Sequence, residues 1–147
     1  MADQATQHMV IGASPQRIWD VLTDFDSYPT WARDLKSATV VARDDEGRPL
    51  DVAFRAAAMG RSTSYTLRYD YGKAPEVLAW RLLNGDITRK LDGSYELAPV
   101  DGDPDRTEVT YHLEVDLMVP IPGFVKRRAE ARIVTTALRD LRSHLER

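Results

Sequence analysis

The 147-residue sequence contains no cysteine and only three histidines, His8, His112 and His144. The lack of cysteine excludes disulfide bonds, thiolate nucleophiles and cysteine-based zinc sites within this chain. The histidines are widely spaced and each is explained as an ordinary surface residue, so we expect no metal site and no cofactor. A cysteine-free chain suits a reducing compartment, and we expect a cytoplasmic protein.

Long hydrophobic runs are also missing. The N-terminal MADQATQHMV has neither the basic region nor the apolar stretch of a secretory signal. The apolar stretch at residues 117–125 is much shorter than the roughly 20 residues that a membrane-spanning helix needs. Phosphate-binding loops, dinucleotide-binding glycine motifs, HExxH and GxSxG are all missing as well, so no familiar catalytic motif identifies an activity.

The composition is that of a globular protein. Hydrophobic residues make up 43% of the chain and charged residues 29%, and the length fits one domain spanning residues 1–147. A formal net charge of −3 argues against general nucleic-acid binding, so we expect no nucleic-acid partner.

Strand-like segments separated by short, glycine-containing turns fill most of the chain. We expect strands at residues 6–13, 35–43, 51–59, 62–71, 76–83, 86–97 and 107–119. In the last of these, Val109, Tyr111 and Leu113 alternate with polar residues, which indicates a strand with one wet face. Short turns join antiparallel neighbours, because a parallel return needs a long crossover. The pattern therefore predicts a seven-stranded antiparallel sheet with one apolar face.

Two helical segments are expected, one after the first strand and one after the last. In SPQRIWDVLTDFDSYPTW, residues 14–31, apolar side chains recur at helical spacing after Ser14, a good helix cap. Phe25, Tyr28 and Trp31 continue into the polar turn that follows, where they either line a cavity entrance or fill the core. Near the C-terminus, about 22 residues with apolar positions at helical spacing predict a helix of roughly 33 Å, long enough to cross the sheet.

The predicted architecture is thus α+β. A curved antiparallel sheet wraps around the long C-terminal helix, and short helices lie between the first and second strands. In this order of elements, the motif SP…IW.VL.DF..YP.W, the run LDGSYELAP…RTEVTYHLEVDLMVPIPGF and the long final helix resemble the START-like (SRPBCC) superfamily. The resemblance is to its polyketide cyclase/dehydrase and lipid-transport group, which also includes coenzyme Q-binding proteins.

The resemblance implies a helix-grip fold with a deep cavity between sheet and C-terminal helix that binds a hydrophobic small molecule. The predicted inward faces and cavity mouth supply a set of ligand-binding candidates: Tyr28, Trp31, Phe54, Tyr65, Leu67, Trp80, Arg89, Tyr95, Tyr111 and Phe124. Such mostly apolar linings are typical of small-molecule pockets, although the same residues also suit a filled core. Arg89 shares its strand parity with Leu91 and Tyr95, so it is either a polar anchor inside the cavity or a residue reaching solvent at the strand end.

Three functions remain open at this stage. The first is binding or carriage of a lipid, a quinone or a polyketide-like molecule. The second is a polyketide cyclase, aromatase or dehydratase acting in the same cavity, for which no catalytic residue can be named. The third is an interaction protein whose cavity is collapsed. The basic C-terminal helix is compatible with contact to anionic lipid, but a solvated outer face explains it more simply. An exposed sheet edge permits a monomer or a homodimer.

Overall fold

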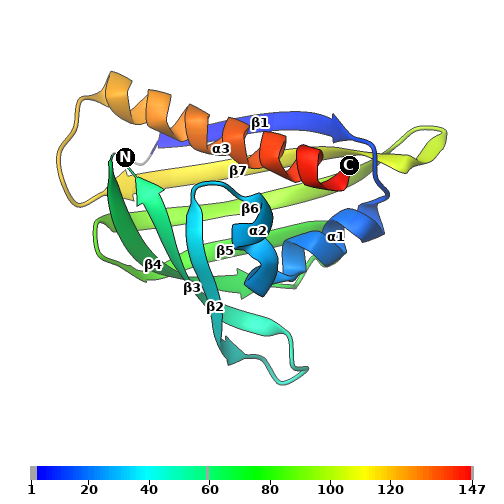
Figure 1. Ribbon diagram of the computed structural model, residues 1–147, viewed down its shortest axis with the longest axis horizontal. Helices are drawn as coiled ribbons and strands as arrows, with labels where there is room; N and C mark the ends of the chain where they lie inside the picture. Colours follow the sequence, from blue (N-terminus) through cyan, green and yellow to red (C-terminus); the bar gives the residue numbers. More distant parts are fainter. Residues whose placement is uncertain (1–2, 59, 147) are drawn as a thin grey trace.

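The computed structural model describes residues 3–58 and 60–146. Its centre is a curved, seven-stranded antiparallel sheet with the strand order β1-β7-β6-β5-β4-β3-β2 (Figure 1). The strands are β1 (Asp3–Ile11), β2 (Leu35–Arg43), β3 (Pro49–Ala58), β4 (Arg61–Asp70), β5 (Val77–Gly85), β6 (Thr88–Val100) and β7 (Asp103–Leu117). The predicted α+β class and the seven antiparallel strands are confirmed.

A short helical segment carries the chain from one edge of the sheet to the other. It consists of α1 (Pro15–Thr23), the 3-10 turn η1 (Phe25–Ser27) and α2 (Tyr28–Trp31), and it connects edge strand β1 to edge strand β2. As expected, the Ser14 side chain caps α1 by accepting a hydrogen bond from the Arg17 amide, and Pro15 lies in the first turn.

Helix α3 (Gly123–Leu145) covers the concave face of the sheet and runs along β1 and β7 (Figure 1). Its inner stripe consists of Val134, Leu138, Leu141 and Leu145, all buried. The end of α3 also packs more tightly than expected for a terminus. His144 is half-buried against Trp31, so the prediction that it is an ordinary surface residue was wrong.

The outer face of the sheet carries the charged residues that the alternation predicted. On this face, Arg68 binds both carboxylate oxygens of Asp51, at 2.8 and 2.9 Å. His112 contacts Glu96 there, and Lys90 contacts Glu114. Within the described residues, none of the helices combines the length and the apolar character needed to cross a membrane.

Candidate functional site

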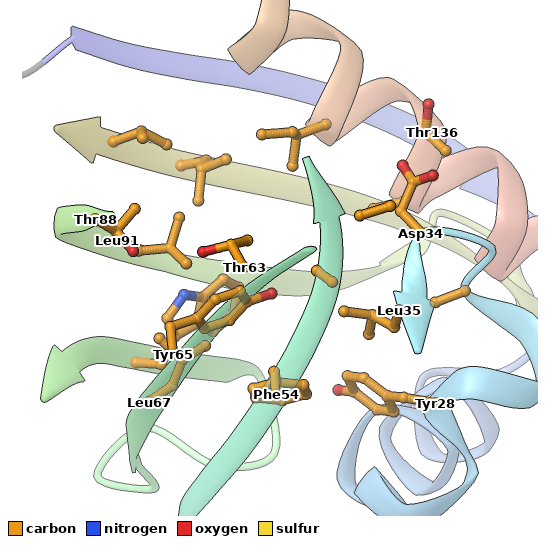
Figure 2. A pocket seen from close by; sticks show the side chains of 18 of the residues that line it. Tyr28, Asp34, Leu35, Phe54, Thr63, Tyr65, Leu67, Thr88, Leu91 and Thr136 are labelled. Carbon is orange, nitrogen blue, oxygen red and sulfur yellow. The ribbon is translucent and has the colours of Figure 1, made fainter. Parts of the chain in front are cut away.

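A cavity of about 220 Å³ lies between the concave face of the sheet and α3 (Figure 2). Its wall comes from α2, from strands β2–β7 and from one side of α3, so distant parts of the chain meet around it. Most of the surface is aromatic or aliphatic, and eight aromatic side chains contribute: Tyr28, Trp31, Phe54, Tyr65, Tyr69, Trp80, Tyr95 and Tyr111.

The indole of Trp80 is the centre of the aromatic wall. Its ring centroid lies 5.8 Å from that of Tyr69, 5.5 Å from Tyr95 and 5.7 Å from Tyr111. The partner opposite Trp80 in the β5–β6 ladder is Gly93, which leaves room for the indole. A Cβ at position 93 would lie 2.7 Å from the Trp80 ring. The glycine therefore leaves room for the Trp80 ring directly over β6.

Burial keeps the cavity tyrosines protonated. Loss of hydration raises the pKa of Tyr65, Tyr95 and Tyr111 well above the usual value, because phenolate is the form that burial disfavours. The Tyr28 hydroxyl donates to the carbonyl of Leu22, whereas no hydrogen bond from the Tyr65 hydroxyl to another described residue is found. The lining thus offers neutral phenol groups, and these are suited to hydrogen bonding with a ligand.

Two polar atoms on the wall are buried and unpaired. Among the described residues, neither the Thr88 hydroxyl nor the Trp31 indole Nε1 has a hydrogen-bond partner. Both residues line the cavity and are 7% and 6% exposed, respectively. A buried polar group without a partner costs free energy, on the order of 1–3 kcal/mol. A bound molecule or water would remove this cost by supplying the missing partners.

Two carboxylates complete the lining. Asp140 of α3 is 9% exposed, and one of its oxygens accepts a hydrogen bond from the Arg33 amide at 3.0 Å. Asp34, just before β2, is exposed at the rim. Figure 2 shows Asp34 and Thr136 of α3 on one side of the cavity, with Thr88 and Leu91 on the other.

Eight of the ten residues predicted from the sequence line the cavity: Tyr28, Trp31, Phe54, Tyr65, Leu67, Trp80, Tyr95 and Tyr111. The structure brings them together from six separate elements, α2 and β3 to β7, and their binding role stays a prediction. The space they enclose is open, so the cavity is not collapsed.

Arg89 does not line the cavity and is exposed. The prediction of its inward parity was wrong because β6 has a register shift between Thr88 and Lys90. The irregularity reverses the alternation, so that Thr88 and Leu91 both face the cavity while Arg89 faces solvent.

Phe124 is the second predicted residue that lies outside the cavity. It is 64% exposed in the first turn of α3, which extends beyond the part of the helix that packs on the sheet. A residue on the predicted face of the helix therefore still reaches solvent at this end.

Some lining residues were not predicted from the sequence. On α3 they are Ile133, Thr136, Ala137 and Asp140. Their spacing of three and four residues forms a second stripe beside the leucine stripe of the core, and this pattern was available in the sequence. Thr88, in contrast, was hidden by the irregularity in β6.

The family model described as polyketide cyclase / dehydrase and lipid transport matches residues 3–146. The chain belongs to this family. No curated protein matches the chain significantly. The family name joins enzymes with transport proteins, so membership of the family does not choose between the two activities.

Solved structures share the fold of this family member. A START superfamily protein from Mycobacterium smegmatis superposes with a TM-score of 0.92 at 23% identity, covering 97% of each chain. The Zhui aromatase/cyclase from a Streptomyces species gives 0.84 at 16% identity, covering 100% of this chain and 95% of that one. A Thermus thermophilus protein gives 0.82 at 20% identity, covering 97% of each chain. These similarities establish the helix-grip fold.

Proposed function

We propose that the protein binds and carries a hydrophobic small molecule, about the size of a one- or two-ring aromatic compound, in the cavity beneath α3. The observation that supports this most directly is an open space of about 220 Å³ walled by eight aromatic side chains. An engineered apolar cavity of about 150 Å³ in another protein holds benzene, so this volume suits a compact molecule of one to two rings. The unpaired Thr88 hydroxyl and Trp31 Nε1 supply polar contacts that fix its orientation.

Catalysis in the same cavity is the second candidate. Its support is that Asp140 and Tyr95 line the same cavity. Burial raises the pKa of the Tyr95 phenol most, followed by Tyr28 and Tyr65, and the Asp140 charge adds a smaller effect in the same direction. A carboxylate base and a phenol donor thus act on the same space, as cyclisation or dehydration requires. The buried phenols hold their protons tightly, however, and no histidine is among the described residues that line the cavity. We therefore place binding first.

Native mass spectrometry of the protein purified from its own host tests the proposal. We expect a discrete co-purified molecule that organic extraction releases. The variant Ala137→Phe places a ring into the cavity from α3 and should lose this molecule. Ala131→Phe adds the same ring to an exposed position of the same helix and should keep it. A ligand-free wild-type protein, or equal retention by both variants, would contradict the proposal.

The extracted molecule also distinguishes carriage from catalysis. Incubation with fresh protein should return it unchanged if the protein is a carrier. A new product, such as one that has lost water, would favour the catalytic alternative. In that case Asp140→Asn should abolish the conversion while the molecule still binds.

A further inference from the structure

The charged side chains among the described residues that line the cavity are all negative. Among the described residues that line it, Asp34 and Asp140 are the only charged side chains, and none is lysine, arginine or histidine. Arg33 lies near Asp140, with Nε 3.6 Å from the carboxylate, but its side chain is 84% exposed and belongs to the solvent side. A ligand with a carboxylate or phosphate would therefore find no cation in the described lining and would meet two carboxylates, of which Asp140 is ion-paired with Arg33 at the solvent side.

The aromatic wall favours the opposite charge. The faces of aromatic rings carry partial negative charge and attract ammonium groups, with tryptophan attracting them most strongly. Trp31 and Trp80 both line the cavity, together with the six other aromatic side chains. The ring faces of this wall and the two carboxylates act in the same direction, because both stabilise a cation.

Asp140 Oδ1 is ion-paired with the exposed Arg33 side chain, but no hydrogen bond to it from another described residue is found. The other oxygen, Oδ2, accepts the hydrogen bond from the Arg33 amide, whereas Oδ1 lies 3.6 Å from Arg33 Nε, beyond hydrogen-bonding distance. The carboxylate is 9% exposed and lies one helical turn beyond Thr136 on the cavity side of α3. An ammonium group that donates to Oδ1 would add a charge-assisted hydrogen bond from the cavity side to a carboxylate that Arg33 contacts from the solvent side.

The two unpaired polar atoms indicate which hydrogen-bonding groups the rest of the ligand would carry. Trp31 Nε1 can only donate a hydrogen bond, so its missing partner must be an acceptor. The Thr88 hydroxyl accepts or donates and lies on the side of the cavity away from Asp34 in Figure 2. A neutral oxygen, such as a hydroxyl or carbonyl group, satisfies either atom without adding charge.

Building on the proposed function, we propose that the ligand is a hydrophobic amine. It has a compact aromatic body, a protonated nitrogen directed at Asp140 and Asp34, and a neutral oxygen for the unpaired donor. The cavity selects against anionic relatives of the same size, such as aromatic carboxylic acids.

Three probes with the same two-ring body test this selectivity. At pH 7, 2-naphthylmethylamine is a cation, 2-naphthalenemethanol is neutral and 2-naphthoic acid is an anion. Calorimetric titration of the intact protein should rank their affinities as amine, alcohol and acid, with the amine binding about tenfold more tightly than the alcohol. An acid that binds as tightly as the alcohol, or an amine that binds no more tightly than the alcohol, would overturn the proposal.

Variants locate the source of the preference. Asp140→Asn keeps an acceptor for the Arg33 amide but removes the charge, and Asp34→Asn changes an exposed rim residue with little risk to folding. Each should reduce the ratio of amine to alcohol affinity by at least about threefold, whereas Asp45→Asn, a distant exposed control, should leave it unchanged. A ratio unaffected by both cavity variants would refute the role of these carboxylates. If none of the probes binds, the proposed ligand-binding function fails together with the inference. Binding of the alcohol without any preference for the amine refutes the inference alone.

Discussion

The indole ring of Trp31 stacks on the imidazole ring of His144, with centroids 6.2 Å apart and ring planes 22° apart. The contact joins α2 to the last turn of α3, and it holds Trp31 in the position where it lines the cavity. The neighbouring Tyr28 ring packs 5.1 Å from Trp31 and 5.2 Å from Phe25. The aromatic residues of this polar turn therefore have two roles, since Phe25 fills the core while Tyr28 and Trp31 face the cavity.

The stack leads to a first prediction. His144→Ala should lower the free energy of unfolding by about 1 kcal/mol, the usual scale of an aromatic pair. It should also weaken ligand binding, because the end of α3 no longer supports Trp31. His144→Phe should restore most of the stability. Urea unfolding of the three proteins measures the effect, and an unchanged midpoint for His144→Ala would show that the contact contributes nothing.

Substitution of Tyr28 tests the hydrogen bond that its hydroxyl makes at the end of α1. Its hydroxyl donates to the Leu22 carbonyl in the last turn of α1, where backbone acceptors lack helical partners. Tyr28→Phe should destabilise the protein by about 1 kcal/mol. Tyr65→Phe is the matched control and should cost less, because its phenol has no such hydrogen bond. Equal losses of stability in the two variants, measured by denaturant unfolding, would refute this role.

Gly93 provides a test of the aromatic wall. A Cβ there would lie 2.5 Å from the His112 carbonyl oxygen and 2.7 Å from the Trp80 ring. Because the carbonyl belongs to the adjacent strand, Gly93→Ala should destabilise the protein by roughly 1–3 kcal/mol and shift the Trp80 fluorescence. Gly12→Ala is the control, since its new Cβ meets only the flexible Glu146 side chain, at 3.3 Å. A Gly93→Ala protein as stable as the wild type would contradict this account.

The tyrosines predict a pH dependence. Burial raises the pKa of the cavity tyrosines above the usual value near 10, and it raises the pKa of the partly exposed Tyr71 to about 12. In the unfolded chain these phenols release protons near pH 10, whereas in the folded protein they keep them. The stabilisation is therefore complete below pH 10 and is lost as the pH rises through the folded-state values.

Absorbance at 295 nm measures this directly. Phenolate should be nearly absent at pH 10 and should appear together with the loss of circular dichroism at higher pH. Reversible phenolate formation near pH 10 by most of the six tyrosines, with the fold intact, would contradict the burial of these residues.

Most of the fold was predictable because period-two alternation reports directly which side chains face the core. The alternation of Tyr111 and Leu113 with His112 and Glu114 is an example, and the structure places each on the expected face. Prediction failed where the strand geometry changes at a position that no pattern in the sequence marks. The sequence left Arg89 either inside the cavity or at the solvent-facing strand end. The irregularity between Thr88 and Lys90 turns the Thr88 hydroxyl, and not Arg89, toward the cavity, so the described lining carries no positive charge. The second stripe of α3, which includes Asp140, was visible in the sequence, but its placement against the cavity depended on how α3 is rotated over the sheet.

The central claim is that the space beneath α3 binds a compact hydrophobic molecule. Calorimetric titration of 2-naphthalenemethanol into the wild-type protein, Ala137→Phe and Ala131→Phe tests it most directly. The account predicts one-to-one binding by the wild type and by Ala131→Phe, and loss of binding by a folded Ala137→Phe protein. Binding that survives Ala137→Phe unchanged, or no binding by the wild type, would contradict it.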